Sequence, residues 1–115
     1  MMTDSEEVLR RLTIGDRAYC RSLVATGMTG GQATLDARSL ALVQLGATMM
    51  VGASTPVWRQ RVSDALEGGL SGDEIVEALT ALAPTLGIDR IVAVAPDVAR
   101  ALDYDVDAAL ERLDP

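Results

Sequence analysis

Arg61 is the main candidate for a functional residue in this chain. It lies in the stretch from Thr55 to Leu79, TPVWRQRVSDALEGGLSGDEIVEAL, whose residue types and spacing suit a binding or catalytic site. A guanidinium is planar, stays protonated at any working pH and can clamp a carboxylate or an enolate. Trp58 precedes Arg61 by one helical turn, where its ring could wall a pocket or stack on the guanidinium. Two plainer alternatives stay open: Arg61 is a solvated arginine or pairs with an acid such as Asp64, and Trp58 belongs to the core or an interface.

Three further polar residues complete the candidate ligand-binding set. Gln44 and Thr48 lie one turn apart in an otherwise apolar segment and could line a ligand cavity. They could equally bond to backbone carbonyls or to a second copy of the chain. Ser54 precedes the helix that carries Arg61, and helix capping is its expected role.

The chain contains one cysteine, Cys20, and no histidine, so it predicts neither an internal disulfide nor a zinc or haem site. A reducing cytoplasm is the expected location. Cys20 could be a nucleophile if its pKa were lowered, or it could be an inert small apolar residue. Asp103, Asp105 and Asp107 lack the glycine and final glutamate of a calcium loop, so helix capping explains them better. We expect no metal and no cofactor.

The composition favours packed helices in one domain of 115 residues. Aliphatic residues dominate, phenylalanine is absent, and all ten basic residues are arginine. The net charge of −7 argues against nucleic acid and anionic membrane surfaces as partners. The uncharged segment 39–58 is long enough to cross a bilayer, but its polar residues and loop-like end favour a buried core helix. The N-terminus has no apolar signal core.

Capping and stop signals predict seven short helices and no strand. Asp4 or Ser5 caps the first helix, Gly15 and Asp16 open the second, and a glycine-rich loop follows over 26–34. Asp36 caps a third helix, 37–51, whose apolar residues lie nearly all round, which places it centrally in the domain or between subunits. The fourth helix starts at Ser54 or Thr55 and stops at the glycine pair 68–69.

The second half of the chain predicts three more helices. Ser71 and Glu74 form a capping box before a helix that runs to Gly87, with Pro84 fraying or kinking its end. The next helix begins at Ile88, and Pro96 should kink or break it. A last helix follows the cap Asp105. Apolar stripes are expected on the first two of these helices, at Ile75, Leu79, Leu82 and Leu86, and at Ile88, Ile91, Val92, Ala95, Val98, Ala99 and Leu102.

Segments 39–53 and 88–102 have more apolar surface than one small bundle can hide. Homo-oligomerisation with closed symmetry is the simplest remedy. The main expected partner is therefore a second copy of the chain.

The order of LDARSLALVQLGA and RVSDALEGGLSGDEIVEALTALAPTLGIDRIVAVAPDVARAL resembles the carboxymuconolactone decarboxylase family, which includes alkyl hydroperoxidase D. The resemblance covers Leu35 to about Tyr104, with 1–34 as N-terminal helices and loop and 105–115 as a C-terminal helix of the same single domain. It implies an all-α bundle of about six to seven short helices around a central antiparallel helical hairpin. It also implies assembly into homodimers, homotrimers or hexamers.

The chain departs from that family at its catalytic residues. The Cys-x-x-Cys-x-x-x-His motif of the peroxidase members would fall on Ser54, Val57 and Arg61, and their glutamate on Ser39. Without thiols there, no dithiol cycle can run. The resemblance therefore implies an oligomeric small-carboxylate binder or scaffold rather than an enzyme.

Two enzymatic alternatives stay open. The first is a lyase, decarboxylase or isomerase acting on a small oxygenated acid. In it, Arg61 would stabilise negative charge and a carboxylate such as Glu67 or Glu74 would move a proton. The second, less favoured, is a peroxidase that works through Cys20 alone.

Overall fold

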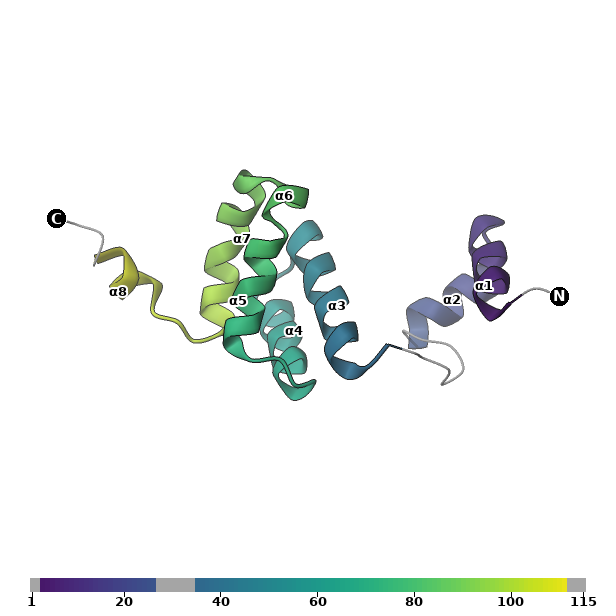
Figure 1. Ribbon diagram of the computed structural model, residues 1–115, viewed down its shortest axis with the longest axis horizontal. Helices are drawn as coiled ribbons and strands as arrows, with labels where there is room; N and C mark the ends of the chain where they lie inside the picture. The colour runs from purple at the N-terminus through teal and green to yellow at the C-terminus, as the bar shows by residue number, and fades with distance from the viewer. Residues whose placement is uncertain (1–2, 27–34, 112–115) are drawn as a thin grey trace. The chain divides into compact units, whose positions relative to one another are not determined.

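Helices make up every element in the part of the chain that the computed structural model describes, residues 3–26 and 35–111 (Figure 1). The expected all-α class is confirmed. Chain contacts divide the protein into two units, one ending at Thr34 and one starting at Leu35. The helices are α1 (Asp4–Thr13), α2 (Arg17–Thr26), α3 (Ala37–Val51), α4 (Thr55–Glu67), α5 (Gly72–Ala81), α6 (Ala83–Leu86), α7 (Ile88–Ala101) and α8 (Val106–Glu111).

The first unit contains α1 and α2. Thr3 caps α1 and forms a capping box with Glu6, so the prediction that Asp4 or Ser5 would be the cap is wrong. Thr3 is the cap because a glutamate follows three residues later. Each of the two side chains then accepts a hydrogen bond from the backbone amide of the other residue. No residue of α1 is buried within the unit.

The N-terminal end of α2 is capped as the sequence predicts, since Asp16 accepts a hydrogen bond from the Tyr19 amide at 3.1 Å. The Arg11 guanidinium lies over the Tyr19 ring, 5.3 Å from its centroid, and so links the two helices. The glycine-rich connection expected after this helix lies largely outside the described residues, because positions 27–34 are not among them.

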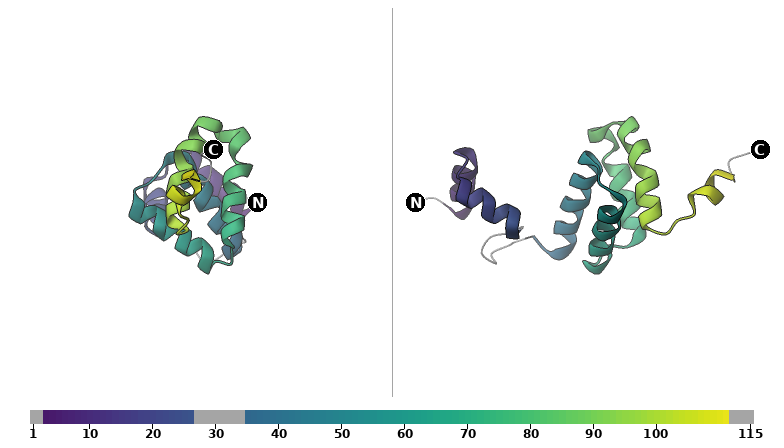
Figure 2. Two further views of the ribbon diagram at one scale, coloured as in Figure 1. Left: turned by 90° about the vertical axis from the view of Figure 1, so that its left-hand side faces the viewer. Right: turned by 180° about the vertical axis from the view of Figure 1, so that it is seen from behind.

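The second unit is built around α3, α4, α5 and α7, which pack against one another (Figure 2). The contact between α3 and α4 is the most extensive of the helix pairs. The apolar side chains that they bury form one core: Ala41, Leu45, Met49, Trp58, Val62, Ala65, Leu70, Ile75, Leu79, Ile91, Val94 and Val98. Aliphatic residues thus supply nearly all of the packing, with a single aromatic ring among them.

Most of the predicted caps and stops lie where the sequence placed them. Asp36 accepts from the Ser39 amide at 2.7 Å, and Asp105 accepts from the Ala108 amide at 2.9 Å. Gly69, two residues after the end of α4, takes a φ of +102°, a conformation that residues with a Cβ rarely adopt. These local signals fix the lengths of the helices that carry the candidate site.

The helix expected to run to Gly87 is instead two helices. α5 ends at Ala81, and the four-residue α6 follows as a separate element. Pro84 lacks the amide hydrogen that would continue the ladder, so the chain restarts with proline in the first turn of α6. The stripe itself is confirmed, because Ile75 and Leu79 are buried and the two later leucines pack against the core.

Of the two predicted effects of Pro96, the break does not occur, because α7 runs from Ile88 to Ala101 as one helix. The proline removes the hydrogen bond to the carbonyl of Val92. Val92 lies on an exposed face of the helix, where water can satisfy that carbonyl. The expected stripe of α7 is also partly wrong: Val94 joins Ile91 and Val98 in the core, while Ile88 and Val92 are 66% and 64% exposed.

Two apolar faces lie on opposite sides of α3. One face enters the core through Ala41, Leu45, Thr48 and Met49. The other, which we call the outer α3 face, carries Val43, Ala47, Met50 and Val51 at the same helical spacing and is exposed. Among the described residues, no helix is long and apolar enough to cross a membrane.

Candidate functional site

Trp58 and Arg61 lie one turn apart on α4. Trp58 is 1% exposed and belongs to the core, and its indole Nε1 finds no acceptor within the described ranges. A buried donor without a partner is uncommon in folded proteins, which makes this atom notable. In the described part of the chain, the ring that stacks under an arginine is Tyr19, not Trp58.

Arg61 is half-buried, and no ion pair or hydrogen bond joins its side chain to another residue that the structure describes. The proposed pairing with Asp64 is not formed, since Asp64 accepts a hydrogen bond from Gln60 at 2.7 Å instead. Arg61 therefore keeps its full hydrogen-bonding capacity for a ligand or for water.

Gln44 and Thr48 meet through the backbone. The Thr48 hydroxyl donates to the Gln44 carbonyl at 2.8 Å, the usual bond of a buried threonine in a helix. Thr48 is buried and the Gln44 side chain is half-buried. Ser54 is exposed at the N-cap position of α4, but its side chain makes no capping hydrogen bond. None of the five predicted binding residues lines the two surface hollows described below.

An ion pair that the sequence analysis missed joins α3 to α5. The Arg38 guanidinium pairs with both carboxylate oxygens of Glu74 and donates to the Gly69 carbonyl at 2.6 Å. Glu74 also accepts from the Ser71 amide at 3.0 Å, within the predicted capping box. Both charged residues lie in the segments that carry the family resemblance, but nothing in the sequence pairs them across 36 positions.

The same contacts decide what Glu74 can do chemically. The Arg38 guanidinium, together with the Ser71 amide, lowers the pKa of Glu74 to about 2. A carboxylate with so low a pKa stays ionised near neutral pH and is a poor proton carrier. Of the two acids considered for a lyase, only Glu67, exposed at the end of α4, is free of such a pairing in the described structure.

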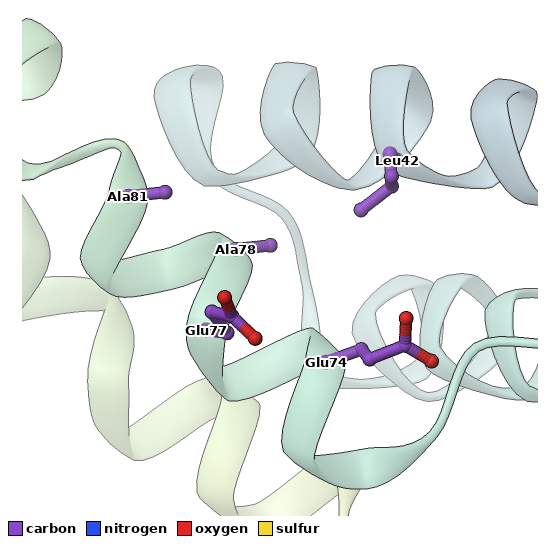
Figure 3. Close-up of a pocket in the computed structure, with 5 residues that line it drawn as sticks. All are labelled: Leu42, Glu74, Glu77, Ala78 and Ala81. Carbon is purple, nitrogen blue, oxygen red and sulfur yellow. The ribbon is translucent and has the colours of Figure 1, made fainter.

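A surface hollow of about 260 Å³ lies between α3 and α5 (Figure 3). Leu42 points from α3 toward α5, and the methyl groups of Ala78 and Ala81 face the same space. Glu74 and Glu77 complete the lining. None of the predicted binding residues contributes to it, and its charge is acidic rather than basic.

A second hollow of about 250 Å³ is lined by Arg100, Tyr104, Asp105 and Asp107. It lies where α7 ends and α8 begins. No group of three or more histidine, cysteine or acidic residues in the described ranges is placed to hold a metal ion. Cys20 is a half-buried free thiol on α2.

Neither a protein-family model, nor a curated protein, nor a solved structure matches this chain.

Proposed function

We propose that the chain is a non-catalytic helical scaffold of the carboxymuconolactone decarboxylase type that assembles with copies of itself through the outer α3 face. The observation that carries the proposal is the composition of that face. Val43, Met50 and Val51 are 59%, 61% and 75% exposed, and no charged residue interrupts α3 after Arg38. Burying apolar surface in an interface stabilises the assembly by about 25 cal/mol per Å² removed from water.

The net charge of the chain also favours the outer α3 face as the interface. Each copy carries a net charge of −7, so two copies repel at most orientations. An uncharged face lets them approach without placing like charges in contact. Because a twofold interface brings the same patch of both copies together, a patch of this kind is suited to self-association.

The scaffold proposal is tested by light scattering of the native chain and of the double variant Val43→Glu/Met50→Glu. Both positions are exposed, so the variant should keep its helical content while its measured mass falls to that of one chain. Thr80→Glu adds a charge at an exposed position of α5 without removing apolar surface, and it should keep the native assembly. A monomeric native chain, or a double variant that still assembles, contradicts the proposal.

A second candidate function is the binding of a small carboxylate at Arg61. Two donors that find no partner within the described ranges support it, the Arg61 guanidinium and the buried Trp58 Nε1, one turn apart on α4. A carboxylate can accept from both kinds of donor. A lyase that uses Arg61 and Glu67 would extend this site, and peroxidase chemistry through Cys20 remains the third alternative.

A further inference from the structure

The α3–α5 hollow differs from the expected carboxylate site in the sign of its charge. Its lining carries two carboxylates, Glu74 and Glu77, and no basic side chain. Glu74 is already neutralised by Arg38. The Glu77 carboxylate makes no ion pair or hydrogen bond within the described ranges, so one negative charge at the hollow is uncompensated.

The rest of the lining is apolar and small. Leu42 supplies an exposed aliphatic side chain from α3, and Ala78 and Ala81 lie one turn apart on α5 (Figure 3). Glu77 lies next to Ala78 in the chain and four residues before Ala81, so its charge lies at one side of an apolar floor. The floor can cover an alkyl chain while the carboxylate holds a cationic head.

Size restricts the ligand further. Pockets for drug-sized molecules usually measure about 300–1,000 Å³, and this hollow, at about 260 Å³, is smaller. A single free carboxylate also matches a single positive charge. We propose that the α3–α5 hollow binds a small aliphatic ammonium ion, with the ammonium group at Glu77 and the alkyl chain against Leu42, Ala78 and Ala81.

The test uses n-butylammonium as the probe and follows the methyl NMR signals of Leu42, Ala78 and Ala81 in the full-length protein. Saturable shifts of these signals are expected with a millimolar dissociation constant, because the hollow is open to water. Methylammonium should bind roughly tenfold more weakly, since it lacks the buried methylenes. Butyrate has the same alkyl portion with the opposite charge and should produce no saturable shift.

Two matched variants test whether Glu77 is the residue that contacts the ammonium group. Glu77→Gln removes an exposed, unpaired charge and should leave the fold intact while weakening n-butylammonium binding by roughly fivefold. Glu111→Gln makes the same change at an exposed position of α8, outside the hollow, and should leave binding unchanged. The proposal is overturned if n-butylammonium gives no saturable shift, if butyrate or methylammonium binds as well, or if Glu77→Gln binds like the native protein.

Discussion

At the scale of single residues, the two predicted binding residues of α4, Trp58 and Arg61, are donors rather than acids or bases. Arg61 cannot take up a proton from a substrate because a guanidinium stays protonated at working pH. Trp58 offers only an N–H donor. The two side chains therefore suit the holding of an anion better than proton transfer, and the carboxylate-binding candidate can be tested at Arg61 directly.

We expect small dicarboxylates and lactone acids to raise the melting temperature of the native chain, and Arg61→Gln to remove that shift. A ligand at about 100 times its dissociation constant adds about 2.7 kcal/mol to the free energy of unfolding. For a domain of this size, that corresponds to roughly 10 °C. The glutamine keeps similar bulk and leaves no broken ion pair, because Arg61 forms none in the described structure.

Arg59→Gln is the matched control, since Arg59 is an exposed arginine on the same helix. It should keep the full shift. A screen in which no carboxylate changes the melting temperature, or in which Arg61→Gln responds like the native chain, removes Arg61 as an anion site. Either result would leave it as a half-buried surface arginine.

At the scale of helices, the Arg38–Glu74 ion pair fastens the start of α3 to the start of α5. The folded pKa of Glu74 is about 2, below the ordinary value of 4.5. A carboxylate with a lowered folded pKa stabilises the native state above its unfolded pKa. That contribution is lost as the pH falls from 4.5 toward 2.

We therefore expect Glu74→Gln to unfold at a lower urea concentration than the native chain at pH 7. The difference between the two should shrink steadily as the pH is lowered through this window, because protonation of Glu74 makes the native chain resemble the variant. Urea titrations at several pH values measure it. A gap that is the same at pH 7 and pH 2.5 would mean that the charge of Glu74 does not contribute to stability.

The sequence predicts those features of the helices that depend on neighbouring residues, and it fails for those that depend on packing against other helices. Caps such as Asp36 and Ser71 involve residues three positions apart, and they are read correctly from the chain alone. That Pro96 leaves α7 unbroken cannot be read in this way, because tolerance of a proline depends on which face of α7 is exposed after packing. The same holds for Val94, whose burial only the neighbouring helices decide.

The candidate site is less predictable than the helices. Sequence spacing correctly puts Trp58 and Arg61 one turn apart, and the bond of Thr48 to the Gln44 carbonyl is one of the alternatives that the sequence leaves open. Spacing cannot pair Arg38 with Glu74, which are 36 positions apart. The α3–α5 hollow was missed for the same reason, since Leu42 and Ala78 come together only in the folded unit.

At the scale of the whole molecule, the net charge of −7 opposes the association that we propose through the outer α3 face. Salt screens the repulsion: the Debye length falls from about 30 Å at 0.01 M to about 3 Å at 1 M ionic strength. We therefore expect self-association to strengthen as sodium chloride is added, as measured by sedimentation velocity at a fixed protein concentration.

Butylammonium binding should respond to salt in the opposite direction, because screening weakens the attraction between Glu77 and a cation. The two salt dependences thus separate the apolar interface from the charged hollow. Self-association that weakens with added salt would indicate an interface held by ion pairs, which the outer α3 face does not contain.

Because Trp58 is buried, its intrinsic fluorescence reports on the state of the core. It is the single tryptophan of the chain, so nearly all emission excited at the red edge of protein absorbance comes from one ring in the core of the second unit. The emission maximum should be blue-shifted in the native protein and move to the red when that core opens. Since α1 and α2 contain no tryptophan, fluorescence follows the second unit alone, whereas circular dichroism follows both. Melting curves from the two signals that fail to coincide would show that the two units unfold separately.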